Sequence, residues 1–208
     1  MKPCNRRCAS ILVPEWGRLR RFLVGCCVVT LLAACATQPP ELPPGVAPQV
    51  DQFELSGRVA VKLEGRGYSA RLRWRHVGDS DTLWIYSPVG STIATLTADG
   101  ELATLVTSKQ ETYQSTDVQS LTRQVLGWDL PLAGLKYWVL GRVDPGLPVE
   151  SIDRDERFRI QRLVQAGWDV DFAAYEKDGT LPSSMILRFE ELRLRLLIDR
   201  WNVATSEP

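Results

Sequence analysis

Apolar and polar residues alternate with a period of two along most of this chain, and this alternation limits the folds open to it more than any other feature. Between residues 53 and 63, the apolar Leu55, Val59 and Val61 are separated by polar residues such as Arg58 and Lys62, although Ala60 is an exception. Successive side chains of a strand point to opposite faces of a sheet, so this pattern predicts a half-buried antiparallel strand.

Similar segments recur along the chain and predict about ten strands. They cover residues 53–63, 68–75, 82–87, 92–97, 101–107, 111–114, 158–165, 168–175, 184–190 and 192–201. Two helical segments stand between the sixth and seventh strands: Asp117 can cap a helix to Leu126, and Pro131 can begin another to Leu140. Residues 144–149 are expected to form a loop. We therefore predict a mainly β fold of the α+β class, in which an antiparallel sheet curls and the helices cover its apolar concave face.

Cysteine placement divides the chain. The five cysteines are Cys4, Cys8, Cys26, Cys27 and Cys35, and none follows position 35. A disulfide framework, a thiolate metal site and a cysteine nucleophile are therefore excluded from the rest of the chain.

The first 34 residues are typical of a secretory signal. Arg18, Arg20 and Arg21 precede an uncharged run, residues 22–32, that is about half the roughly 20 residues that a bilayer requires. A short membrane or core helix is the alternative. Leu32-Ala33-Ala34-Cys35 resembles a bacterial lipobox, which implies cleavage before Cys35 and lipidation of that cysteine.

The position after the cysteine bears on location. Ala36 stands where an aspartate commonly marks inner-membrane retention, so the lipobox resemblance implies the outer membrane, facing the periplasm. Five prolines between residues 37 and 48 favour an extended tether. We divide the chain into a signal at 1–34, a lipidated tether at 35–50, a folded domain at 51–203 and a tail at 204–208.

The charge balance argues against nucleic-acid binding. Six of the 25 basic residues but only one of the 25 acidic residues precede Cys35. The remaining chain is therefore acidic, and no basic stripe is evident along it, whereas nucleic-acid binding depends on neutralising phosphates.

No catalytic set or metal site emerges from the sequence. His76 is the only histidine and is expected to be a solvated residue at a strand end, and no Gly-x-Ser-x-Gly motif is present. Asp153, Asp155 and Glu156 lack the glycine and distal glutamate of a calcium loop. A carboxylate pair at 169 and 171 is expected on the wet side of its strand. We therefore expect no enzyme activity and no cofactor.

Two features leave alternatives open. Six tryptophans between residues 74 and 201 could fill a core or line a ligand cavity. Pro88 and Gly90 predict a turn around Val89, whose side chain either packs on its own sheet or projects into solvent.

Several segments, in order along the chain, resemble the LolB family of outer-membrane lipoproteins. They are residues 53–61, 87–90, 127–131, 135–141, 165–168 and 197–201. The resemblance implies an unclosed antiparallel barrel of about ten or eleven strands, with an apolar cavity lidded by helices. It also implies a receptor that takes acylated lipoproteins from the periplasmic carrier LolA and inserts them into the outer membrane, without catalysis.

The resemblance also assigns individual positions. Pro88, Val89 and Gly90 match the membrane-insertion turn, in which Val89 replaces the usual leucine. Some relatives have a helix before the first strand. In this chain the proline-rich stretch leaves little room for that helix.

We expect the protein to be a monomer.

We expect the concave strand faces to line the cavity. The candidate residues are Leu55, Val59, Val61, Leu72, Trp74, Leu83, Ile85, Leu194, Leu196 and Ile198. A lipid-anchored assembly module with a filled core and an envelope hydrolase are the alternative functions.

Overall fold

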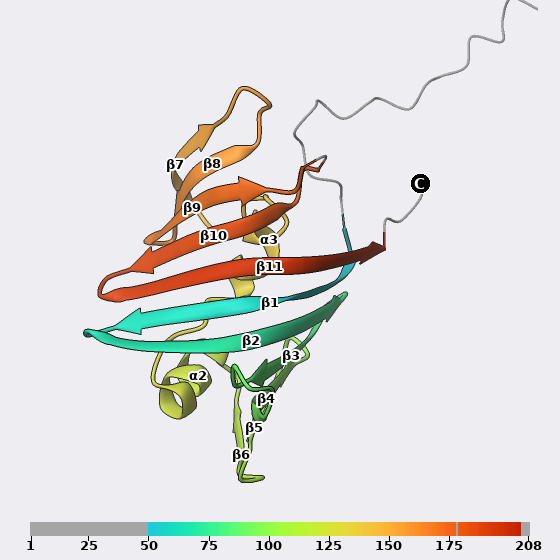
Figure 1. Ribbon diagram of the computed structural model, residues 1–208, viewed down its shortest axis with the longest axis vertical. Coiled ribbons are helices and arrows are strands. Elements are labelled where there is room, and N and C mark those ends of the chain that lie inside the picture. Colours follow the sequence, from blue (N-terminus) through green and yellow to red (C-terminus); the bar gives the residue numbers. More distant parts are fainter. Residues whose placement is uncertain (1–49, 178, 205–208) are drawn as a thin grey trace, which may run out of the picture. The chain divides into compact units, whose positions relative to one another are not determined.

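The described part of the computed structural model, residues 50–177 and 179–204, is built on one antiparallel sheet of eleven strands (Figure 1). In chain order the strands are β1 (Gln52–Leu63), β2 (Arg66–Val77), β3 (Ser80–Tyr86), β4 (Thr92–Ala98), β5 (Ala103–Thr107), β6 (Thr112–Ser115), β7 (Val149–Arg154), β8 (Ile160–Gln165), β9 (Trp168–Tyr175), β10 (Pro182–Phe189) and β11 (Leu192–Ala204). Their spatial order is β6-β5-β4-β3-β2-β1-β11-β10-β9-β8-β7. The edge strands β6 and β7 are not paired with each other, so the barrel is unclosed.

Hairpins connect most neighbouring strands, but the centre of the sheet depends on a long-range pair. The first strand, β1, pairs with the last, β11, from Gln52 opposite Ala204 to Lys62 opposite Arg193. A bulge interrupts this pairing at Gly57, where an added Cβ would lie 2.1 Å from the carbonyl oxygen of Leu197. Glycine is required at this point because the two backbones approach each other so closely.

The helices occupy the predicted place between β6 and β7. Helix α2 (Val118–Leu126) begins after its N-cap, Asp117, and ends at Gly127, whose φ of 83° is the left-handed conformation that glycine adopts readily. Helix α3 (Leu132–Trp138) is shorter than the predicted segment, which extended to Leu140. Figure 1 shows α2 near β6, and buried side chains of both helices join the hydrophobic core.

One strand was missed by the sequence analysis. All six residues of β7 are exposed, so no alternation of burial marks it, and only its pairing with β8 identifies it. Asp153 belongs to β7, and the following turn is held by Asp155, which accepts hydrogen bonds from the backbone N–H groups of Arg157 and Arg159. Burial raises the pKa of Asp155, but the hydrogen bonds from Arg159 and Arg157 outweigh it, so the pKa is lowered overall.

The hydrophobic core is contained within residues 50–198 of the described chain. A part of the chain that holds its own core is expected to fold independently. Among the described residues, no helix is both long and apolar enough to cross a membrane. The predicted signal, Cys35, residues 36–49 of the tether and any helix before β1 lie outside the described residues, as does the tail beyond residue 204. Val50, the last residue of the predicted tether, is described and is buried in the core.

Candidate functional site

A cavity of about 420 Å³ lies between the inner face of the sheet and the helical segment. Its walls come from β1, β2, β3, β4, β10, β11, α2, α3 and the loop between the helices. The lining residues are Val59, Val61, Gly67, Tyr68, Ser69, Ala70, Leu72, Leu83, Ile85, Ile93, Leu126, Trp128, Leu130, Leu135, Leu187, Leu194 and Leu196.

This lining is apolar and carries no ionisable acid or base other than the phenol of Tyr68. Ser69 and the indole of Trp128 are its other polar side chains. A polar or charged guest would lose hydration in such a cavity without gaining partners, whereas an apolar guest would lose contact with water favourably. The volume falls within the roughly 300–1,000 Å³ of ligand pockets. The cavity is therefore suited to a hydrocarbon ligand.

Seven of the ten predicted cavity residues lie on its wall: Val59, Val61, Leu72, Leu83, Ile85, Leu194 and Leu196. The structure differs from the prediction at Leu55, Trp74 and Ile198, which point inward but are buried in the solid core. At that end of the barrel the ring of Phe53 packs against Trp74 at 5.1 Å and against Trp201 at 5.7 Å, between ring centroids. Alternation identifies the inward face of a strand, but it does not show where along the strand aromatic side chains fill the interior.

Residues of the lid were missed as cavity residues. Leu126, Trp128, Leu130 and Leu135 come from the helical segment, whose covering position was predicted; Leu126 was placed on the apolar side of the first helix, but none of the four was named as a cavity residue. On the strands, Tyr68, Ala70, Ile93 and Leu187 were also missed, although the same alternation could have found the first two. Tyr68 and Ile93 are 55% and 38% exposed, so this part of the lining reaches the protein surface.

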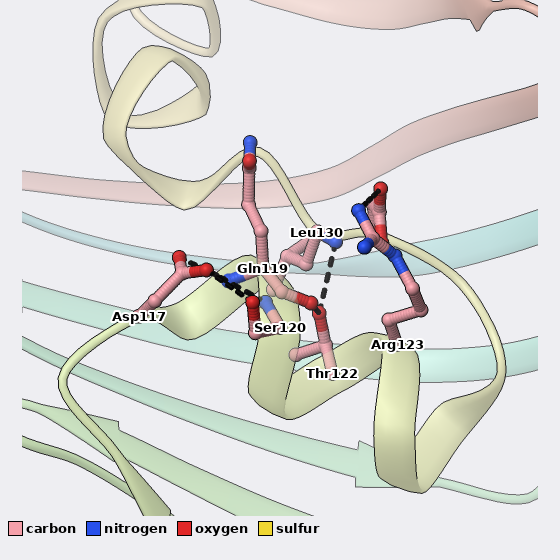
Figure 2. Close-up of polar contacts among 7 residues, drawn as sticks. Asp117, Gln119, Ser120, Thr122, Arg123 and Leu130 are labelled. Atoms are coloured by element: carbon pink, nitrogen blue, oxygen red, sulfur yellow. Dashed lines mark hydrogen bonds and ion pairs between the residues drawn. The ribbon is translucent and has the colours of Figure 1, made fainter.

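Polar contacts hold the first part of the lid in place (Figure 2). Asp117 accepts hydrogen bonds from the N–H groups of Gln119 and Ser120 and from the Ser120 hydroxyl. These bonds, the hydroxyl bond foremost, lower the pKa of the Asp117 carboxyl. Beyond the helix, the hydroxyl of Thr122 accepts from the Leu130 N–H at 3.0 Å and donates to the Gln119 carbonyl at 3.1 Å. The loop that carries Trp128 is therefore tied back to α2.

The Arg123 guanidinium also spans this loop. Its Nε and Nη2 atoms donate to the two carboxylate oxygens of Asp129, with 2.6 Å between Nε and Oδ1. A paired guanidinium and carboxylate fix both distance and orientation. This contact and the Thr122 bond tie the two residues after Trp128, Asp129 and Leu130, back to α2.

A buried glutamine holds the second part of the lid. Gln165, in β8, is fully buried; its Oε1 accepts from Trp138 Nε1 at 2.9 Å and from the Asp144 N–H at 3.0 Å. Its Nε2 donates to the carbonyls of Asp144 at 2.8 Å and Leu147 at 3.0 Å. The end of α3 is thereby fixed to the sheet. Sequence reasoning gave Gln165 no role, because nothing local shows that a strand glutamine faces inward.

The turn after β3 presents Val89 to solvent. Val89 is 90% exposed, and the turn is closed by its own backbone: Ser87 N donates to Ser91 O at 2.7 Å and Gly90 N donates to Ser87 O at 2.9 Å. Gly90 has a φ of 98°, which strongly favours glycine. Of the two alternatives for Val89, the structure therefore has the projecting side chain, held on a rigid turn.

The catalytic candidates are placed in structural roles. His76 is buried, not solvated as expected, because its ring stacks on Phe53 at 5.1 Å and its Nδ1 lies 2.8 Å from Asp81 Oδ1. The same oxygen of Asp81 accepts a hydrogen bond from Trp74 Nε1 at 2.7 Å.

The carboxylate pair of β9 is neutralised by arginines. Asp169 pairs with Arg162 at 3.0 Å, and Asp171 pairs with Arg188 at 2.6 Å. Among the described residues, no group of three or more histidine, cysteine, aspartate or glutamate side chains is placed to hold a metal ion.

Sequence comparison matches residues 51–201 to the family described as outer membrane lipoprotein LolB. The chain belongs to the LolB family. Outer-membrane lipoprotein LolB of Thiobacillus denitrificans is 35% identical over 189 residues, which cover 89% of this chain and all of the relative. That of Nitrosomonas europaea is 36% identical over 160 residues, 75% of each chain. Among solved structures, a LolA superfamily protein of Nitrosomonas europaea has a TM-score of 0.48 at 7% identity, covering 80% of this chain and 92% of that one.

Membership of the LolB family confirms the resemblance seen in the sequence. The unclosed antiparallel barrel with two helices between its sixth and seventh strands is confirmed by the topology. The family's name also supports an outer-membrane lipoprotein.

Proposed function

We propose that this LolB family member accepts lipoproteins from the periplasmic carrier LolA by sheltering their acyl chains in the cavity, and then inserts them into the inner leaflet of the outer membrane. The observation that carries the proposal is the apolar cavity beneath a two-helix lid. An open cavity favours this function over that of an assembly module with a filled core.

The energetics of an acyl chain require such a shelter. Exposing about 15 methylenes to water costs on the order of 12 kcal/mol, at about 0.8 kcal/mol each. A lipoprotein must therefore pass from one apolar site to the next without entering bulk water. The passage needs no catalysis if each acceptor binds the chains more tightly than the donor, with the bilayer as the last and tightest acceptor.

Two further parts of the proposal concern the membrane. Lipidation at Cys35 would hold the protein, as a monomer, on the periplasmic face of the outer membrane; two or three acyl chains give durable anchoring. The turn of Pro88, Val89 and Gly90 would enter the lipid layer during delivery. Its rigid backbone and exposed apolar side chain suit that role.

Photo-crosslinking tests the cavity directly. A photoreactive residue replaces Leu72 of β2 or Leu196 of β11 on the cavity wall. In the matched controls it replaces Trp84 of the neighbouring strand β3 or Leu197 of β11, whose side chains face away from the cavity. Carrier-bound lipoprotein with a labelled acyl chain is then added. We expect crosslinks from the two cavity positions only. Equal crosslinking from the outward positions, or none from the cavity, would contradict the proposal.

A cavity-filling variant gives a second test. Ala70 lines the cavity and is half-buried. The phenyl ring of Ala70→Phe would therefore fill part of the cavity with little disturbance of the fold. We expect an unchanged melting temperature and a loss of lipoprotein acceptance from the carrier. Acceptance at the parent level by a folded variant would show that the chains bind elsewhere.

A further inference from the structure

The outward face of the three central strands is strongly basic. On β2, arginines stand at the alternate positions 71, 73 and 75, and on β11 they stand at 193, 195 and 200; all six are exposed. Arg58 and Lys62 of β1 lie between these rows. We call these eight residues the basic face. No basic stripe was expected from the sequence, and this expectation was wrong, because Arg58 of β1 and Asp199 of β11 are 141 residues apart and become neighbours only in the fold.

Few carboxylates neutralise the basic face. Glu54 pairs with Arg73 at 2.9 Å and Asp199 with Arg58 at 2.8 Å. Among the described residues, Arg71, Arg193 and Arg195 have no carboxylate partner within ion-pair distance.

The strand register places like charges opposite one another. Arg58 stands opposite Arg71, and Lys62 stands opposite Arg193. Like charges in directly opposite positions destabilise a sheet. These like-charge pairs lower the stability of the isolated protein. Such a cost is expected where an anionic partner binds the face and neutralises its positive charge.

The basic face adjoins the exposed turn. Tyr86, the last residue of β3 before the turn, stands opposite Arg71. Pro88 lines one surface groove together with Arg58, Arg71 and Arg195. The turn that carries Val89 thus borders the groove lined by Arg71 and Arg195, two of the three arginines without a carboxylate partner.

We propose that the basic face binds the phosphate groups of a phospholipid membrane and lays the protein on the bilayer while the Val89 turn enters it. This inference rests on the proposed delivery step. Alternate residues of a strand lie about 6.6–6.8 Å apart, so the arginines form an extended array of charges on a sheet and not a closed pocket. An extended array suits a charged surface, and guanidinium groups bind phosphate oxygens well. The apolar tip beside the basic face favours a membrane over an acidic protein.

Vesicle binding tests the inference. The protein begins at Ala36, so that it lacks the lipid anchor but keeps the whole sheet and both helices. The face variant combines Arg71→Gln, Arg193→Gln and Arg195→Gln. Its matched control combines Arg154→Gln, Arg157→Gln and Lys177→Gln, three exposed side chains on β7, on the turn after it and after β9, outside the three central strands, for the same change in net charge. Binding is measured by co-sedimentation with vesicles of pure phosphatidylcholine and with vesicles containing phosphatidylglycerol, and folding by thermal melting.

We expect the parent to bind the phosphatidylglycerol vesicles and to dissociate as salt is raised. Each basic residue near an anionic surface changes the partition coefficient roughly fivefold, so the face variant should bind on the order of 100-fold more weakly. The control variant should bind almost as the parent does. An equal loss in both variants, or no binding by the parent, would overturn the inference.

Lipoprotein transfer separates the remaining outcomes. If the face variant binds vesicles as the parent does but no longer accepts lipoprotein from the carrier, the basic face docks an acidic protein and the membrane inference is wrong. If vesicle binding fails while transfer from carrier to bilayer proceeds, only this inference is lost. If vesicle binding holds while the parent transfers no lipoprotein, the proposed function fails instead.

Discussion

The side chain at position 89 should set the rate at which lipoprotein is delivered to a bilayer. Val89 is 90% exposed on a turn closed by its own hydrogen bonds, so a substitution there removes almost no contact within the protein. Each methylene transferred from water to hydrocarbon contributes about 0.8 kcal/mol, or about fourfold in rate if the side chain enters the membrane in the rate-limiting step. Val89→Leu adds one carbon and should deliver about fourfold faster. Val89→Ala removes two and should deliver about 15-fold more slowly.

The assay follows a fluorescent lipoprotein from the preloaded protein into phospholipid vesicles. Val89→Glu extends the series, because a carboxylate resists entry into hydrocarbon; this variant should still accept lipoprotein from the carrier but release it slowest of all. Val149 of β7 is 42% exposed and lies on an edge strand, so the same alanine and leucine substitutions there are the matched control. A rate that does not depend on the residue at 89, or that depends equally on the residue at 149, would refute the reasoning.

Three further predictions concern the support of the site. Gln165→Ala leaves buried donors such as Trp138 Nε1 without an acceptor, so the unfolding free energy should fall by about 3–5 kcal/mol. Urea denaturation measures this change. A loss under 1 kcal/mol would show that water replaces the side chain. Asp117→Ala should cost about 1 kcal/mol through the lost helix cap. Because folding lowers the pKa of Asp117, the ionised carboxylate stabilises the fold above the unfolded pKa of about 3.9, and this stabilisation is lost as the pH falls through the folded pKa. The parent and Asp117→Ala should therefore differ in unfolding free energy at pH 7 and converge in acid. A difference that does not depend on pH would argue against the charged cap. Gly57→Ala should cost about 1–3 kcal/mol or more by forcing β1 away from β11, and an unchanged melting temperature would mean that the bulge can shift.

The fold could be predicted largely from local patterns. Strands with one buried face, such as 168–175, show their period directly, and Asp117 and Gly127 mark the ends of α2. Strand β7 could not be found, because an edge strand with both faces exposed has no period in its sequence. Pairing with β8 stabilises it, and that pairing is a property of the assembled sheet.

The candidate site could be predicted in part. The alternation on β1, β2, β3 and β11 identified inward-facing residues, and seven of them border the cavity. It could not separate the hollow end of the barrel from the end at which Phe53, Trp74 and Trp201 pack together. Nor could it place Leu126 or Trp128 on the cavity wall, since the position of the loop after α2 depends on contacts made by Thr122 and Arg123.

The sequence by itself determined the antiparallel sheet, the placing of two helices within it and the family, because periodicity, capping residues and ordered motifs are written along the chain. Only the tertiary structure decided where the sheet stays open, how large the cavity is and which arginines lie together. These properties arise from contacts between residues far apart in sequence, such as the pairing of β1 with β11, and from how completely side chains fill the space between them.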